Sequence, residues 1–233
     1  MNAGELSNPD IAWPTVILFL VASSLFLLFA WLGVSKSAPL YVTLPIQTIL
    51  AFALFTPTHD ATHSAVGKGK FKWINYLVGR CYGFLVLAPF PAFRWIHLSH
   101  HKHTNTHHDP DNWSKGIVIE IYSSTQSLGG SSSLFLPLFW ATQDFHYYTH
   151  YIPEALYHQR RPFWEVVESL ATLIALYTIP YQLCVKGYAY ETFLFWILPT
   201  RLSTTLLAWL FDYVPHRPHK VSSFIYFSLT LCI

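Results

Sequence analysis

The chain has 233 residues, of which 52% are hydrophobic and only 11% are charged, and its formal net charge at pH 7 is +2. Soluble domains carry about 25% charged residues, so this composition argues against a water-soluble enzyme and favours a membrane protein. The small net charge and the lack of a basic stripe in the sequence give no reason to expect a nucleic-acid partner.

Four apolar segments approach or reach the length of about 20 residues that a spanning helix needs. Residues 13–34 and 40–56 form one pair, and residues 166–185 and 193–211 form another, each pair joined by a short polar turn. Residues 1–12 contain two acids and no Lys or Arg, which does not suit a cleaved signal peptide, so we expect a polar N-terminal tail. The sequence predicts an all-α, multi-pass membrane protein with about four spanning helices in two hairpins.

The segments between the two hairpins are too polar or too short to span. Residues 71–90 are apolar but contain charged side chains, so we expect them to lie along the interface or to enter the bilayer only partway. A polar stretch at 94–115 and a Ser- and Gly-rich loop at 123–133 follow. Residues 134–140 and 145–151 are short and apolar or aromatic, and we expect them at the membrane surface.

Basic residues divide unevenly between the two ends of the spans. Lys36 and Lys186 fall in the hairpin turns, and Arg201 falls inside a span. All the histidines lie on the opposite side. The other basic residues lie there too: Lys68, Lys70, Lys72, Arg80, Arg94, Lys102, Lys115, Arg160, Arg161, Arg217 and Lys220. Because basic residues concentrate in cytoplasmic loops, we expect the histidine-rich face in the cytosol or its equivalent, in an organelle that the sequence does not indicate. For Arg201 a functional role and a structural one, with carbonyls freed by Pro199 as partners, both remain open.

Two histidine clusters stand at the polar ends of these helices. His59 and His63 follow the second span, and His97, His100 and His101 lie in the polar stretch beyond it. Offsets of three and four residues place the imidazoles of each cluster on one helical face. Neutral imidazoles gain little from one another, whereas a metal ion binds their ring nitrogens. Five histidines exceed what one tetrahedral site takes, so we predict a pair of metal ions in a shared cavity.

Three acids, Asp60, Asp109 and Asp111, lie near these histidines in the sequence. A carboxylate can accept the far ring N–H of a metal-bound imidazole and so fix its orientation. Alternatively, Arg94 and Lys102 pair with these acids as solvated surface charge. The sequence does not decide between the two interpretations.

The segments THDATHSAV and FPAFRWIHLSHHKHTNTHHDPDNWS resemble the first two histidine boxes of the integral-membrane fatty acid desaturase superfamily. That superfamily has the pattern H-x3-H, H-x2-H-H and a late H-x2-H-H. The second box is also similar to that of carotenoid hydroxylases of the same superfamily, and WLFDYVPHRPHK resembles a segment that precedes the last box in some bacterial-type members. The resemblance implies two non-haem iron ions held by the five box histidines, with a further ligand from His216 or His219.

The implied chemistry is the O2-dependent oxidation of an apolar lipid chain. Fatty acid (acyl-lipid) desaturation is the first expectation, and carotenoid or lipid hydroxylation is the alternative. The sequence has no haem-attachment motif, no Gly-rich dinucleotide fingerprint and no iron–sulfur spacing, so electrons would come from an external donor of ferredoxin or cytochrome b5 type. A metal-binding membrane protein without catalysis is the alternative from another class.

The resemblance also implies that residues 13–233 form a desaturase-like membrane domain without the last histidine box. After the fourth span there is only HRPH at 216–219, which lacks the doubled histidine, and its proline disfavours a regular helix. An apolar run at 224–233 ends the sequence. We expect an incomplete family member, truncated at its C-terminus, with an under-coordinated second iron and no activity alone. The alternative is a compact variant in which the HRPH histidines, with His103 or His107, complete the site.

Overall fold

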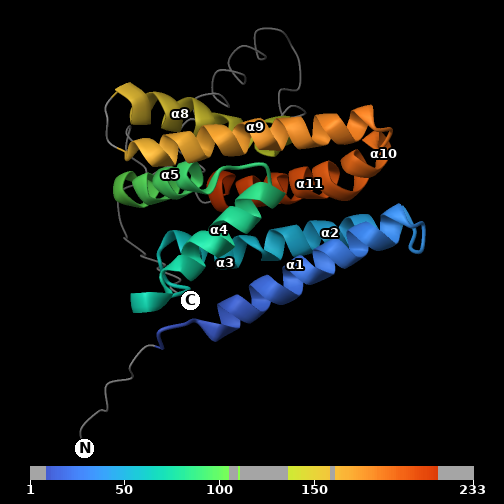
Figure 1. Cartoon of the computed structure of the whole chain (residues 1–233), viewed down its shortest axis with the longest axis horizontal. Helices are drawn as coiled ribbons and strands as arrows, with labels where there is room; N and C mark the ends of the chain where they lie inside the picture. Colours follow the sequence, from blue (N-terminus) through green and yellow to red (C-terminus); the bar gives the residue numbers. More distant parts are fainter. Residues whose placement is uncertain (1–8, 105–109, 111–135, 158–160, 215–233) are drawn as a thin grey trace, which may run out of the picture.

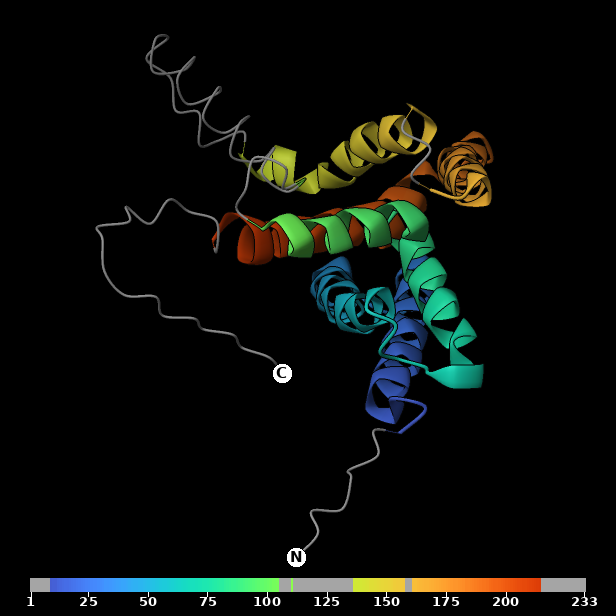
Figure 2. The same cartoon turned by 90° about the vertical axis from the view of Figure 1, so that its left-hand side faces the viewer.

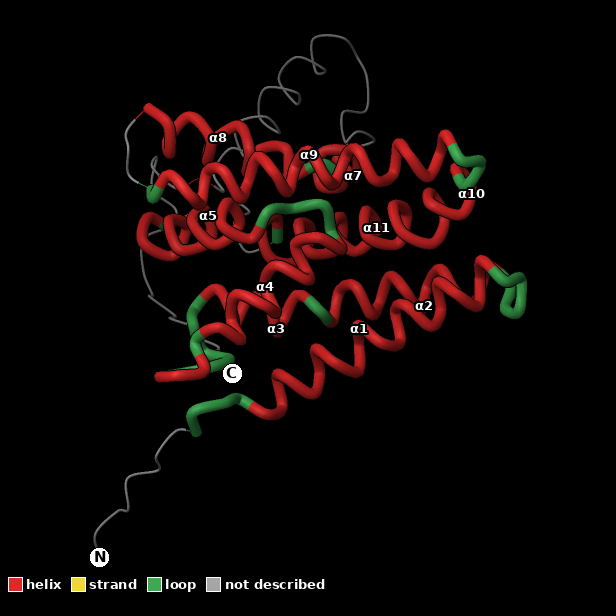
Figure 3. Tube along the Cα trace, in the orientation of Figure 1, coloured by secondary structure: helices red, strands yellow, loops and turns green. Residues whose placement is uncertain are grey.

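The computed structural model describes residues 9–104, 110, 136–157 and 161–214. Within these ranges the chain is helical, with one isolated β-bridge between Ile11 and Gly67 and no strand (Figures 1 and 3). The prediction of an all-α fold is confirmed.

Four helices in the described part of the chain are long and apolar enough to cross a membrane, as predicted. They are Trp13–Val34, Leu40–Thr62, Phe163–Val185 and Ala189–Phe211. Leu27 in the first of these spans is 66% exposed and Ile174 in the third is 68% exposed. Apolar surface of this extent suits contact with lipid rather than water.

The first hairpin consists of α1 (Trp13–Val34) and α2 (Leu40–Ala53), and α3 (Phe55–Thr62) continues α2 after a single residue. The second span therefore runs beyond residue 56, where the sequence placed its end. This extension places His59 and His63 at the end of the second span.

The second hairpin consists of α9 (Phe163–Val185), α10 (Ala189–Thr192) and α11 (Leu198–Leu207). Two π-helical segments, Phe193–Ile197 and Ala208–Tyr213, flank α11, and the sequence did not predict them. In the buried interior Gln47 Nε2 of α2 donates a hydrogen bond to the Phe195 carbonyl oxygen in the first π segment, at 2.9 Å. The two hairpins are thus joined by a polar contact within an apolar environment, where such bonds have no water to compete with.

Between the hairpins, α4 (Trp73–Leu85) and α5 (Phe90–His103) meet at a bend of 104° (Figure 2). Glycine makes this close turn possible, because a Cβ at Gly83 would lie 2.4 Å from the Ala88 carbonyl oxygen. With 13 residues, α4 is shorter than a full span.

Two further helices cover the far side of α5 and α11. They are α7 (Leu136–Ala141) and α8 (Gln143–Tyr157), where the sequence predicted short surface segments at 134–140 and 145–151. In Figure 1, α5 and α11 lie between this upper layer, which includes α9, and the lower layer of α1 to α4. The polar end of α3 meets α5 inside this arrangement.

Candidate metal centre and cavity

Four of the predicted ligands converge on one point. Ring nitrogens of His59, His63, His97 and His101 all lie within 4.8 Å of one another, and we call these residues the imidazole cluster. The Nε2 atom of His97 is 3.1 Å from Nε2 of His63 and 3.0 Å from Nε2 of His101. The two boxes therefore share one face, although their role as ligands remains a prediction.

Helix geometry explains the convergence. His59 lies in the last turn of α3, and His63 is the residue that caps this helix, with its N–H donating to the His59 carbonyl at 3.2 Å. On α5, His97 and His101 are one turn apart, and their ring centres are 4.6 Å apart. The end of α3 and the side of α5 therefore each supply two imidazoles to the same place.

His100 stands slightly apart from the imidazole cluster. Its ring centre is 5.7 Å from that of His101, and its side chain lines the adjacent cavity. It belongs to α5 but is turned away from the point where the other four nitrogens meet. A second ion would need His100 together with further ligands.

Asp60 lies beside the imidazole cluster, held by a residue that the sequence analysis missed. Its Oδ1 atom is 3.8 Å from Nδ1 of His59, and its Oδ2 atom accepts a hydrogen bond from Thr15 Oγ1 on α1 at 2.9 Å. This placement suits an acid that orients His59, although 3.8 Å exceeds hydrogen-bond length. The other predicted site residues lie outside the described residues: Asp109, Asp111, His216 and His219.

The surroundings of His97 and His63 lower the pKa of both imidazoles. Burial, reinforced by the neighbouring His59 and His101, lowers the pKa of His97 to about 2. Burial, followed by the charge of His59, also lowers the pKa of His63. At pH 7 the lone pairs of these nitrogens are therefore available to a metal ion.

The imidazole cluster fits a metal ion in spacing and in chemistry. Metal–nitrogen bonds of about 2.1 Å put ligands on opposite sides of an ion about 4.2 Å apart. The 4.8 Å limit within the imidazole cluster requires only a small contraction to reach that spacing. Imidazole is a ligand that iron, zinc and copper all accept, so the donor set does not by itself select the metal.

A cavity of about 360 Å³ adjoins the imidazole cluster. His59, His97 and His101 of the imidazole cluster lie along part of its wall together with His100, whereas His63 does not line it. Most of the remaining wall is apolar and includes Phe55, Tyr82, Val86, Phe90, Leu207 and Phe211. Its volume is in the range of small-molecule sites. The cavity thus offers an apolar compartment next to the predicted metal ligands.

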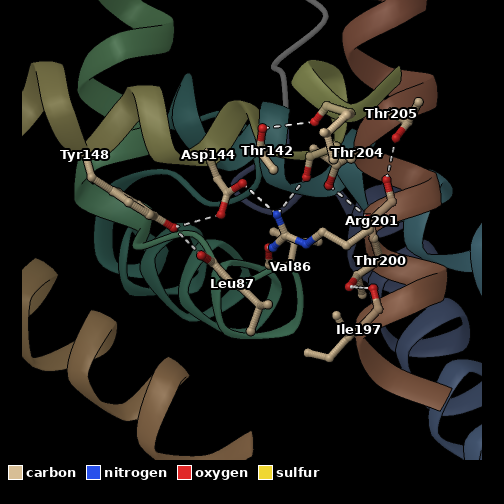
Figure 4. A network of polar contacts seen from close by, with 12 residues as sticks. Val86, Leu87, Thr142, Asp144, Tyr148, Ile197, Thr200, Arg201, Thr204 and Thr205 are labelled. Atoms are coloured by element: carbon tan, nitrogen blue, oxygen red, sulfur yellow. Dashed lines mark hydrogen bonds and ion pairs between the residues drawn. The ribbon is translucent and has the colours of Figure 1, made fainter. Parts of the chain in front are cut away.

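Arg201, inside the fourth span, is held by a network of polar contacts (Figure 4). It donates to Asp144 Oδ1 at 2.6 Å, to the Ala141 carbonyl at 3.0 Å and to the Val86 carbonyl at 2.9 Å. Tyr148 donates to Asp144 Oδ2 and to the carbonyl of Leu87. The sequence suggested carbonyls freed by a proline as partners, but these contacts come from α7, α8 and the turn between α4 and α5. We call them the Arg201 network.

The described residues form an α-helical protein with four helices apolar enough to span a membrane and an imidazole cluster beside a largely apolar cavity. Residues 36–227 match the fatty acid desaturase family, and the chain belongs to that family. The predicted resemblance is confirmed, and with the four apolar helices it makes the chain an integral membrane protein.

Several characterised proteins are similar to parts of the chain. An sn-1 oleoyl-lipid 12-desaturase of Picosynechococcus sp. is 29% identical over 121 residues, which cover 51% of this chain and 33% of that protein. An sn-1 acyl-lipid omega-3 desaturase (ferredoxin) of Nostoc sp. is 32% identical over 68 residues, 29% of this chain and 18% of that protein. A beta-carotene ketolase of Paracoccus sp. strain PC1 is 31% identical over 121 residues, 48% of each chain. The matches thus cover about half or less of these relatives, and no solved structure matches.

Proposed function

We propose that this chain is a membrane-bound oxidoreductase that uses two non-haem irons and O2 to oxidise an apolar lipid chain, with a membrane acyl lipid as substrate and desaturation as the reaction. The observation that carries the proposal is the imidazole cluster at the wall of a largely apolar cavity of about 360 Å³. An unactivated C–H bond offers no polar handle, so a protein that oxidises it depends on shape and position.

Each part of the site has a separate task in this proposal. The imidazole cluster holds one iron, and His100 contributes to the second with a ligand from His216 or His219. When bound, the irons supply the activation of O2 that removal of hydrogen from an alkyl chain requires. Asp60 orients His59, and Asp109 and Asp111 act in the same way on other ligands.

The cavity wall positions the substrate and excludes water. Phe55 and Phe93 pack edge to face, with ring centres 6.1 Å apart, and Phe93 stacks on His97 at 5.6 Å. The ring centre of Phe211, on the fourth span, lies 5.7 Å from that of Phe55, so the fourth span also contributes to the wall. An acyl chain against these rings would lie directly beside the imidazole cluster.

Electrons come from an external donor in this proposal. A ferredoxin-type donor is favoured because the Nostoc relative is named with ferredoxin, and a cytochrome b5-type donor is the alternative. The distribution of basic residues supports a histidine face in the cytosol or its equivalent.

Two other functions have support. The similarity to a beta-carotene ketolase favours a carotenoid as an alternative substrate, with oxygen added to the product. The imidazole cluster alone is equally what a metal-binding membrane protein without catalysis would need.

Expression of the chain with a ferredoxin and its reductase, followed by mass spectrometry of extracted lipids, tests the proposal. A new double bond in an acyl chain supports desaturation, and an added oxygen supports the hydroxylase or ketolase alternative. Iron bound without product supports the alternative of a metal-binding membrane protein without catalysis. Unchanged lipids in a protein that binds no iron contradict the proposal.

A further inference from the structure

One arginine connects the two histidine pairs. Arg94 lies on α5, one turn before His97, and its guanidinium reaches the end of α3. Its Nε atom donates to the Thr62 carbonyl at 3.1 Å, and an Nη atom donates to Ser64 Oγ at 3.2 Å. Thr62 and Ser64 are the residues on either side of His63. A single side chain of α5, the helix of His97, His100 and His101, therefore holds both sequence neighbours of His63 at the end of α3.

The end of α3 has an unusual residue at its turn. Ser64 N–H donates to the Ala61 carbonyl at 3.0 Å, and Ala65 N–H donates to the Asp60 carbonyl at 2.9 Å, which together form a Schellman motif. Ser64 has φ of +58°, the left-handed conformation in which helices usually place glycine. Serine is less suited than glycine to this backbone, but only serine supplies the hydroxyl that accepts from Arg94.

Arg94 also binds the Thr62 carbonyl, which the Schellman motif leaves without a partner. The last carbonyls of a helix have no partner within the helix. The Schellman bonds satisfy those of Asp60 and Ala61, and the Thr62 carbonyl accepts from Arg94. The guanidinium has its N–H donors in a fixed plane, so it can donate to a carbonyl and a hydroxyl at the same time. A lysine ammonium could also donate to both, but it would not fix their relative positions.

We propose that Arg94 is a positioning residue that sets the spacing between the two histidine pairs, acting through the Thr62 carbonyl and the Ser64 hydroxyl. The spacing it controls is the 3.1 Å approach of His63 Nε2 to His97 Nε2. This inference rests on the metal-binding part of the proposed function. Outer contacts that orient metal ligands typically contribute about 10–100-fold to metal affinity.

The test is a Co²⁺ titration of the purified full chain in detergent, followed by the visible absorption of the bound ion. We expect Arg94→Gln to weaken Co²⁺ binding about 10–100-fold and to change the spectrum, and Arg94→Lys to restore part of the affinity. The control is Arg80→Gln, which removes a two-bond arginine contact to Glu168 on α9, with distances of 2.6 and 2.7 Å. Within the described residues, Arg80 makes no hydrogen bond to a histidine. This control should bind Co²⁺ as the unsubstituted chain does.

Ser64→Gly separates positioning from general stability. Glycine relieves the left-handed backbone, so the thermal midpoint should stay the same or rise, while loss of the hydroxyl should still weaken Co²⁺ binding. This variant keeps the proposal testable if Arg94→Gln does not fold. Unchanged affinity and spectrum in Ser64→Gly, or equal losses in Arg80→Gln and Arg94→Gln, overturn the inference while the metal site stands. If the unsubstituted chain binds no Co²⁺, both the inference and the metal-binding part of the proposed function are wrong.

Discussion

The Arg201 network and the imidazole cluster are both polar groups in an apolar protein, yet their partners differ in kind. In the Arg201 network donors meet acceptors, and a positive guanidinium meets the Asp144 carboxylate at 2.6 Å. In the imidazole cluster identical groups face one another: the Nε2 atom of His97 lies 3.1 Å from that of His63 and 3.0 Å from that of His101. A pair of neutral imidazoles shares at most one proton between two facing nitrogens.

This difference is what we expect between a structural polar group and a metal site. The Arg201 network is complete within the protein, because charge, carbonyls and a phenol satisfy one another. The imidazole cluster gathers four ring nitrogens within 4.8 Å of one another, more than the protons shared between facing rings can pair, and a metal ion would bind the remaining lone pairs. The burial of polar side chains would not by itself have distinguished the Arg201 network from the imidazole cluster.

The largest effect is expected from breaking the Arg201 network. The side chains of Arg201 and Asp144 are 17% and 7% exposed, so Arg201→Met leaves an uncompensated buried carboxylate. We expect a loss of about 3–5 kcal/mol in the free energy of unfolding, measured by thermal or denaturant unfolding in detergent. The double variant Arg201→Met with Asp144→Leu should recover most of the loss. A double variant as unstable as the single one would show that the pair is not the cause.

The next effect concerns the imidazole cluster and should change metal binding rather than folding. His97 has the shortest contacts in the cluster, so we expect His97→Ala to lower metal affinity by at least about 100-fold. The matched control is Lys102→Ala, on the same helix as His97 but with no imidazole to bind a metal ion. Metal titration monitored by absorption or calorimetry measures both. Equal affinities in the two variants would rule out His97 as a ligand.

A third prediction concerns how the stability of the chain depends on pH through His97. The pKa of His97 is about 2 in the folded chain and about 6.5 when unfolded, so below pH 6.5 the unfolded state takes up a proton that the folded state does not. The stability of the metal-free chain should therefore fall as the pH drops from 7 to 5 and should be nearly constant above about 7.5. His97→Phe should reduce that slope, measured by thermal unfolding across pH. The same slope in both proteins would contradict a His97 that stays neutral in the folded chain.

The smallest effect is expected at Thr15. Thr15→Val removes the hydrogen bond to Asp60 that holds the carboxylate beside His59. A hydrogen bond of this kind contributes about 1 kcal/mol, so metal affinity should fall only about fivefold. Thr15→Ser, which retains a hydroxyl, should behave as the unsubstituted chain. A loss in Thr15→Ser equal to that in Thr15→Val would point to packing rather than to the hydroxyl.

Hydropathy and residue spacing predicted the features that depend on nearby sequence. The first span was predicted with its observed bounds, and the four-residue offsets within each box correctly placed His59 beside His63 and His97 beside His101. These successes follow from helix periodicity and from the length a bilayer demands.

Features that depend on distant contacts were not predicted. Asp144 lies 57 residues from Arg201 in the sequence, and nothing in its surroundings identifies it as the partner. The contact of Arg94 with Ser64 also depends on how α5 meets α3, and the sequence had offered acids as its partners. The π-helical segments, likewise, have no signal in the apolar run of the fourth span.

The most direct test of the account is the metal content of the full chain, purified from membranes of cells supplied with iron. Elemental analysis by mass spectrometry, normalised to protein by amino-acid analysis, gives the ions per chain. We predict iron in preference to zinc, at about two ions per chain, with a clear decrease in His97→Ala and none in Lys102→Ala. Zinc alone, no bound metal, or iron unaffected by His97→Ala would contradict the proposal that the imidazole cluster is an iron site.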